Sequence, residues 1–171
     1  QSQCRQVERE PVHVDGDDPV GVDVNRFPLH LTALTLAGRT GGGDGPQLVH
    51  GSFFDLAPGT DRLVTAGADG AAETGPFDAV VGNPPYVRQG DLSPDADHFR
   101  RHLEALGPDG ETPYADGSRA ISKRSDAYVY FVTHATRFLR EGGRLGVVVP
   151  NKWLTTKYGA TFQRFLYDHY R

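Results

Sequence analysis

The chain of 171 residues contains a single cysteine, Cys4, a single tryptophan and no methionine. One cysteine excludes an internal disulfide and a zinc site built from cysteines. No apolar run approaches the roughly 20 residues that a membrane-spanning helix needs, and the N-terminus lacks the apolar core of a signal peptide. His98 and His102 are one turn apart on a predicted helix, but no third metal ligand accompanies them. We therefore predict a cytoplasmic protein with no membrane partner and no metal.

Charge is unevenly divided along the chain. Residues 1–85 hold 5 Lys or Arg against 12 Asp or Glu, whereas residues 86–171 hold 13 against 10. Basic residues in the second half are suited to contacts with phosphates. Scattered charges on a solvated surface are the alternative interpretation.

Strands alternate with helices over residues 19–171, which predicts an α/β fold with a parallel sheet. The expected strands are 19–24, 47–52, 79–81 and 145–149. The last is a continuous apolar run, which is typical of a strand that is covered on both faces.

Helices are expected between these strands, bounded by capping residues and glycines. Asn25 is a favourable N-cap for the first helix, and four side chains are expected on its buried face: Phe27, Leu31, Leu34 and Leu36. Ser125 is expected to cap a helix over 126–141 that Gly142 and Gly143 end. The last helix is expected over 156–170, with three buried side chains: Phe162, Phe165 and Leu166.

The most informative segment follows the strand that stops at Gly82: Asn83-Pro84-Pro85-Tyr86. It is expected at the carboxyl edge of a parallel sheet, where α/β proteins bind ligands. Consecutive prolines stiffen the backbone and remove two donors, which leaves carbonyl acceptors. Together with the Asn83 amide and the Tyr86 ring, the loop suits a planar group with an exocyclic amine. A proline turn that only ends the strand is the alternative.

This tetrapeptide resembles the catalytic motif of S-adenosylmethionine-dependent DNA adenine-N6 methyltransferases. Residues 20–25, 51–55 and 125–154 are similar to further segments of that family, and they occur in the family's order. The last segment resembles Type II restriction-modification enzymes that are associated with nucleases. The resemblance implies a Rossmann-like methyltransferase fold over 19–171 with an insert at 88–124, preceded by a poorly defined segment, 1–18.

The family resemblance also implies a function and its residues. A methyl group would pass from S-adenosylmethionine to the N6 amine of a flipped adenine in DNA, and the catalytic residues would be Asn83, Pro84, Pro85 and Tyr86. Asp23 would bind the cofactor ribose, Val24 and Phe53 would enclose the cofactor adenine, and Ser52 stands where the family usually has an acid. A surface acid that caps the next helix is the alternative for Asp23.

DNA contacts are expected in the loops after the catalytic motif, from Arg88, Lys123, Arg124, Lys152 and Trp153. A packed side chain is the alternative for Trp153, because an aromatic residue beside an apolar strand is usually packed.

The family's glycine-rich loop, which holds the methionine end of the cofactor, does not occur upstream of Asp23. The resemblance therefore implies a fragment whose sheet lacks the first strand and the C-terminal strands. A nuclease or target-recognition domain or subunit is the expected partner besides DNA. We expect the chain alone to bind S-adenosylmethionine weakly and to methylate little. Two alternatives stay open: a protein-glutamine or ribosomal RNA methyltransferase with the same motif, and a non-catalytic methyltransferase remnant.

Overall fold

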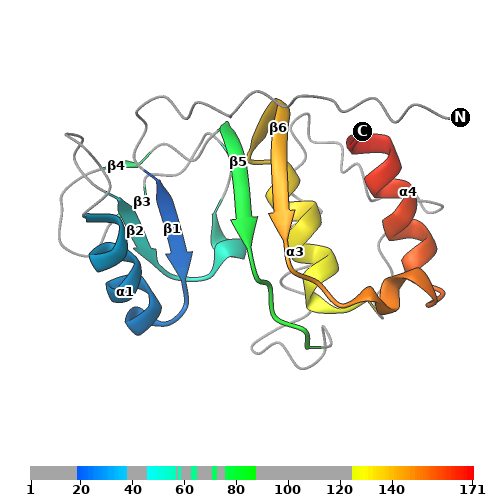
Figure 1. The fold of residues 1–171 in the computed structure, drawn as a ribbon, viewed down its shortest axis with the longest axis horizontal. Helices are drawn as coiled ribbons and strands as arrows, with labels where there is room; N and C mark the ends of the chain where they lie inside the picture. The colour runs from blue at the N-terminus through cyan, green and yellow to red at the C-terminus, as the bar shows by residue number, and fades with distance from the viewer. Residues whose placement is uncertain are drawn as a thin grey trace, which may run out of the picture.

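The computed structural model describes residues 19–37, 46–56, 58, 63–64, 71–72, 76–87 and 125–171. Four strands in this part form two parallel pairs, and three helices flank them: α1 (Arg26–Ala37), α3 (Ala127–Thr136) and α4 (Gly159–His169) (Figure 1). A short antiparallel pair is formed by β3 (Leu63–Val64) and β4 (Ala71–Ala72). The alternation of helices with parallel strands confirms the predicted α/β class and parallel pairing. Residues 1–18 and 88–124, which the prediction set apart, lie outside the described residues.

The first parallel pair joins β1 (Val20–Asp23) to β2 (Gln47–His50), and α1 connects them. The helix and the strands approach closely at Gly21. A Cβ there would lie 2.9 Å from Leu48 Cδ2 and 4.0 Å from Thr32 Cγ2. Both predicted strands and the helix between them are confirmed.

Helix α1 turns a different face toward the strands than its sequence pattern predicts. Phe27, Leu31 and Leu34 are 71%, 49% and 76% exposed, whereas Leu29 is buried. The prediction of a buried face was therefore wrong for three of its four residues, and Leu36 is half-buried. The helix carries apolar side chains on more than one stripe, so helical spacing alone does not select the stripe that meets the strands.

The second parallel pair joins β5 (Phe77–Gly82) to β6 (Leu139–Val147), and its register is interrupted near the start. Phe77 pairs with the first residue of β6, but Ala79 pairs with Arg144, so residues 140–143 bulge from the ladder. Gly142 lies in this bulge with a φ of 74°. Glycine adopts that left-handed conformation without the clash that a Cβ would cause.

The predicted helix over 126–141 was too long, because α3 ends at Thr136 and β6 begins at Leu139. Backbone hydrogen bonds that span three residues, donated by Arg137 and Phe138, close the helix. The Phe138 carbonyl then accepts a hydrogen bond from Phe77 N at 2.6 Å, which starts the pairing with β5. The glycine pair therefore shapes the bulge in β6 and does not end the helix.

Three clusters of buried side chains hold the described elements together, and two of them include residues of the strands. One packs α3 and α4 against β6, and its buried members are Tyr128, Val129, Val132, Phe162 and Phe165. The burial of Phe162 and Phe165 confirms the predicted inner face of α4. The other cluster contains Val49, Leu56 and Phe138, with half-buried side chains of β1 and β5 around them. The described strands of the two pairs share no ladder, so apolar packing connects them.

Strand β6 is covered on one face only. Leu145 and Val147 pack against the cluster of α3 and α4, whereas Arg144 and Gly146 are exposed, and Val81 on the paired strand is 81% exposed. The prediction of a strand covered on both faces was therefore wrong.

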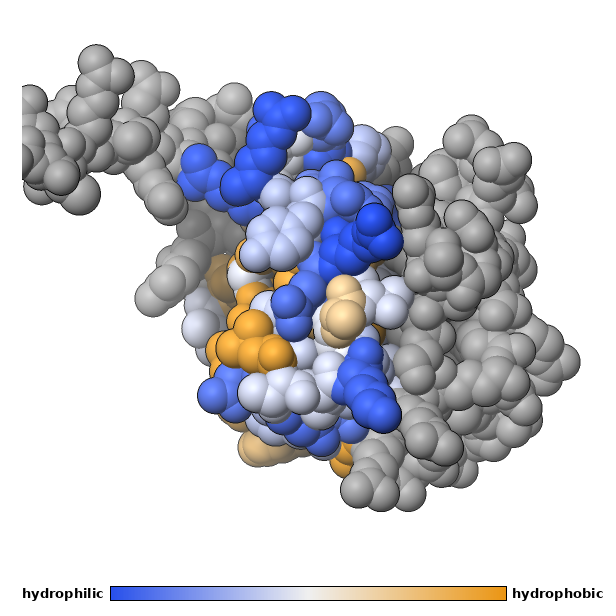
Figure 2. All heavy atoms as spheres, turned by 90° about the vertical axis from the view of Figure 1, so that its right-hand side faces the viewer, coloured by the Kyte–Doolittle hydropathy of each residue, from blue (hydrophilic) through white to orange (hydrophobic). Residues whose placement is uncertain are grey.

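α4 forms the outer layer, and Figure 2 shows mainly hydrophilic residues in the described part of the face on that side. None of the described helices has the length and apolar character needed to cross a membrane.

Candidate active site

The predicted catalytic loop, residues 83–86, begins where β5 ends, at the carboxyl edge of the second parallel pair (Figure 1). Pro84 is buried, and Asn83, Pro85 and Tyr86 are exposed. The Tyr86 hydroxyl lies 2.6 Å from Asn83 Oδ1 and 3.1 Å from the Val148 carbonyl oxygen, and its single hydrogen is shared between these two acceptors. The loop therefore presents an amide oxygen and a half-exposed tyrosine whose hydroxyl reaches a backbone carbonyl just beyond β6.

Two other segments hold the catalytic loop from its two ends. Before the loop, Val148 N donates a hydrogen bond to Gly82 O at 3.2 Å. After the loop, Ala127 N donates to Val87 O at 2.9 Å. Val148 directly follows β6 and Ala127 begins α3. The position of the loop thus depends on both the end of β6 and the start of α3.

The predicted cofactor residues lie at the carboxyl end of the first parallel pair: Asp23, Val24, Ser52 and Phe53. Asp23 is half-buried, and its Oδ1 accepts a hydrogen bond from Asn25 N at 2.7 Å, which makes a local turn at the start of α1. Gly51 N donates to Asp23 O at 3.0 Å and extends the pairing beyond β2. Because β1 and β2 are parallel, the structure brings these residues to one sheet edge.

Ser52 and Phe53 have structural partners of their own. Ser52 caps the short helix η1 (Phe53–Asp55), since its Oγ accepts a hydrogen bond from Phe54 N at 3.3 Å. The Phe53 ring meets the ring of His134 edge-on, with centroids 4.8 Å apart. His134 is fully buried, and its Nε2 lies 3.1 Å from the Phe53 carbonyl oxygen. A carbonyl oxygen only accepts, so Nε2 carries the hydrogen.

The predicted DNA contacts divide into two groups. Three of them lie outside the described residues: Arg88, Lys123 and Arg124. The other two lie in η3 (Asn151–Leu154), the turn that follows β6. Trp153 is half-buried and meets Phe162 edge-on at a centroid distance of 5.3 Å, as the packed alternative described. Lys152 Nζ lies 2.5 Å from Asp126 Oδ2, so this cation has a protein carboxylate as its partner.

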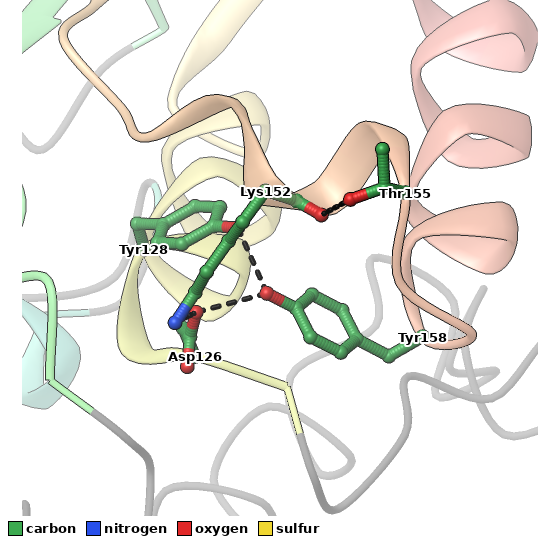
Figure 3. Close-up of polar contacts among 5 residues, drawn as sticks. All are labelled: Asp126, Tyr128, Lys152, Thr155 and Tyr158. Atoms are coloured by element: carbon green, nitrogen blue, oxygen red, sulfur yellow. Dashed lines mark hydrogen bonds and ion pairs between the residues drawn. The ribbon is translucent and has the colours of Figure 1, made fainter.

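Asp126 is the centre of a polar group that we call the Asp126 cluster: Asp126, Lys152, Tyr158 and Tyr128 (Figure 3). The Asp126 side chain is only 3% exposed and accepts a hydrogen bond from the Tyr158 hydroxyl at 2.8 Å, besides the ion pair with Lys152. The Tyr158 and Tyr128 hydroxyl oxygens are 3.0 Å apart. Burial of Tyr128, reinforced by this hydrogen bond, raises the pKa of its hydroxyl above the ordinary value of tyrosine.

Sequence reasoning missed this cluster. It assigned the N-cap of α3 to Ser125, whereas Asp126 occupies the cap position and makes no cap hydrogen bond with its side chain. Ser125 is buried instead. The Asp126 carboxylate turns toward residues that lie beyond β6 in the sequence. The available signal was an acidic residue at the start of an otherwise apolar helix.

Comparison with known proteins places the chain in the class of restriction-modification methyltransferases. The model of one family, the Eco57I restriction-modification methylase, matches residues 20–171. The chain therefore belongs to this family.

Curated relatives are similar over parts of their length. Over 95 residues, 56% of this chain and 14% of the relative, the chain is 33% identical to the Type II methyltransferase M.BstVI of Geobacillus stearothermophilus. It is 25% identical to M.BanIII of Aneurinibacillus aneurinilyticus over 158 residues, which cover 92% of this chain and 24% of that relative. It is 27% identical to the restriction enzyme and methyltransferase RM.Eco57I of Escherichia coli over 93 residues, 54% of this chain and 8% of the relative. The chain thus spans a minor part of these relatives.

Proposed function

We propose that the chain carries the acceptor site of an enzyme that transfers a methyl group from S-adenosylmethionine to the N6 amine of adenine in DNA, within a restriction-modification system. The observation that supports the proposal most directly is the catalytic loop at the end of β5, where the Tyr86 hydroxyl lies within hydrogen-bond distance of both Asn83 Oδ1 and the Val148 carbonyl oxygen. Family membership supports the proposal, and two relatives are named Type II methyltransferases. A nuclease activity or partner is proposed because RM.Eco57I is named as both restriction enzyme and methyltransferase.

The acceptor chemistry follows from the loop. An adenine amine is a poor nucleophile because its lone pair is delocalised into the ring. Asn83 Oδ1 and the Pro84 carbonyl would accept its two N–H groups and favour a pyramidal nitrogen with an available lone pair. The base must leave the duplex to reach this site, and stacking on Tyr86 would contribute about 1–3 kcal/mol. Correct positioning of the reacting groups is worth roughly 7–11 kcal/mol.

The cofactor half is proposed at the end of the first parallel pair. S-adenosylmethionine supplies an electrophilic methyl group on its sulfonium when it is bound. Asp23 ends β1 and is half-buried, so its carboxylate fits an acceptor for ribose hydroxyls. Phe53 and Val24 supply apolar surface at the same edge, and Ser52 caps η1, the short helix that begins at Phe53.

The test measures methyl transfer by the purified intact protein from tritiated S-adenosylmethionine to unmethylated duplex DNA, to ribosomal RNA and to release factor. We expect label in DNA only, and N6-methyladenine after digestion to nucleosides. Asn83→Ala removes the side-chain acceptor and is expected to lower kcat by roughly 100-fold or more. Asn83→Asp keeps an acceptor oxygen at the same place and is expected to retain more activity than Asn83→Ala.

Three outcomes would contradict the proposal. Label in RNA or protein would show that DNA is not the only substrate, and N4-methylcytosine in the digest would show that the enzyme methylates cytosine. Equal rates of methyl transfer by Asn83→Ala and the parent protein would show that Asn83 has no part in catalysis.

A further inference from the structure

The Asp126 cluster places a buried carboxylate next to the catalytic loop and pairs it with a cation at the surface. The Asp126 side chain is 3% exposed, and its partner Lys152 is about half-exposed at 47%. A buried carboxylate needs compensating partners, because isolated charge is strongly disfavoured away from water. Lys152 and the Tyr158 hydroxyl supply that compensation on the same oxygen, Oδ2 (Figure 3).

The ion-paired residues of the cluster, Asp126 and Lys152, belong to the two segments that hold the catalytic loop. Asp126 immediately precedes Ala127, whose amide bonds to the end of the loop at Val87. Lys152 lies in η3, shortly after Val148. The Val148 carbonyl accepts a hydrogen bond from the Tyr86 hydroxyl, and the Val148 amide donates one to the Gly82 carbonyl. The ion pair therefore ties together two supports of one loop.

We propose that Asp126, Lys152 and Tyr158 are positioning residues that fix the catalytic loop for methyl transfer. This inference rests on the proposed function and deepens it. It gives Lys152 a role different from the phosphate contact expected from its charge, because a cation held by a buried carboxylate is already neutralised. The cluster acts through Ala127 and Val148 and does not touch the base.

Kinetics distinguish positioning from DNA contact. With the intact protein, Lys152→Met is expected to lower kcat roughly 10-fold and to change the KM for DNA less than about threefold, since an interaction that orients the reacting groups acts on turnover. Tyr158→Phe is expected to lower kcat by about threefold. Lys152→Arg retains the charge and is expected to recover most of the activity.

The double variant Asp126→Asn/Lys152→Met gives the sharpest comparison. Removal of Lys152 alone leaves a buried carboxylate without its cation, whereas the double variant leaves no buried charge. We therefore expect the double variant to be no less active than Lys152→Met. Two matched controls lie on the exposed side of α4: Arg164→Met removes a cation and Tyr167→Phe removes a hydroxyl. Both are expected to behave like the parent protein.

Amide hydrogen exchange supplies a readout that does not depend on methyl transfer. Lys152→Met is expected to speed exchange at Ala127 and Val148 by about 10-fold, because their hydrogen bonds to the loop weaken. Exchange at Gly51, whose amide bonds to Asp23 in the first parallel pair, is expected to stay unchanged. Tyr158→Phe, which removes no charge, provides the same comparison if Lys152→Met fails to fold.

The outcomes separate this inference from the proposed function. A protein that transfers no methyl group to DNA contradicts the proposed function, and the exchange rates then still decide the positioning role. A higher KM for DNA with unchanged kcat and unchanged exchange would make Lys152 a DNA contact and overturn the inference. Unchanged exchange at Ala127 and Val148 in both single variants would overturn it as well.

Discussion

Tyr128 lies fully inside the protein, and its hydroxyl is within hydrogen-bond distance of Tyr158. Burial raises the pKa of Tyr128 above the ordinary value near 10. The unfolded chain therefore releases this proton at a lower pH than the folded protein does. Stability from this residue is complete below pH 10 and declines as the pH rises further. The expected decline in the free energy of unfolding is about 1.4 kcal/mol for each pH unit above 10.

Urea denaturation between pH 8 and pH 11.5 measures this effect when the parent chain is compared with Tyr128→Phe. The difference in unfolding free energy between the two is expected to be constant up to about pH 10 and to shrink above it. Tyr167 is 83% exposed, so Tyr167→Phe should follow the parent at every pH. If the difference in unfolding free energy between the parent chain and Tyr128→Phe does not depend on pH, the raised pKa of Tyr128 is contradicted.

The same scale shows which site residues a sequence can reveal. Asn83 and Tyr86 are three positions apart, and the strand before them places them at a sheet edge, so both were predictable from local order. His134 and Asp126 act through partners at Phe53 and Lys152, far away in the sequence. Helical periodicity predicts that such residues are buried, but it does not indicate which distant residues they contact.

At the scale of elements, Gly159 allows α4 to meet the turn η3. A Cβ at this position would lie 1.6 Å from the Trp153 carbonyl oxygen, which is a backbone atom that no side-chain rotation moves. Gly159→Ala is therefore expected to lower the free energy of unfolding by about 1–3 kcal/mol or more, as overpacking does. Thermal or urea unfolding measures the loss.

Gly51→Ala is the matched control, because a Cβ there meets nothing within 4 Å. Its effect is expected to stay within about 0.5 kcal/mol. Trp153 is the only tryptophan of the chain, so its fluorescence reports the same event. We expect a red shift in Gly159→Ala as the indole leaves Phe162, and none in the control. Equal free energies of unfolding for the two variants would contradict this prediction, because they would show that η3 accommodates the added Cβ without loss of stability.

Element order could be predicted from the sequence, whereas faces and ends could not. Strands β1 and β2 and helices α1, α3 and α4 lie within predicted segments, whereas β5 and β6 overlap the predicted strands 79–81 and 145–149 but begin earlier. The errors arose where two arrangements satisfy one pattern. Gly142 and Gly143 suit a helix end as well as a strand bulge, and the pairing of Phe77 with Phe138 and Leu139 decides between them. That partner lies outside any local window.

At the scale of the whole molecule, α3 connects the two halves of the proposed site. Its first turn bonds to Val87 beside the catalytic loop, and near its other end His134 bonds to Phe53 in the cofactor half. The two parallel pairs share no ladder among the described strands. Alignment of acceptor and donor sites therefore depends on this helix and on the apolar cluster around Phe138.

The cofactor residues proposed in this chain all serve the adenosine part of S-adenosylmethionine: Asp23, Val24, Ser52 and Phe53. The glycine-rich loop that would hold the methionine part does not occur upstream of Asp23. We therefore expect the 171-residue chain to bind adenosine and S-adenosylmethionine with affinities within about threefold, a difference below 1 kcal/mol. Calorimetric titration of the chain with each ligand measures both affinities.

Asp23→Asn provides the control for this titration, since it removes the charge that accepts from ribose hydroxyls. A hydrogen bond to a charged group contributes about 1.5–3 kcal/mol, so both ligands are expected to bind roughly 10- to 100-fold more weakly. Tighter binding of S-adenosylmethionine than of adenosine by tenfold or more would contradict the prediction. Residues of this chain would then hold the methionine end as well, and the chain would contain a complete cofactor site rather than its adenosine half.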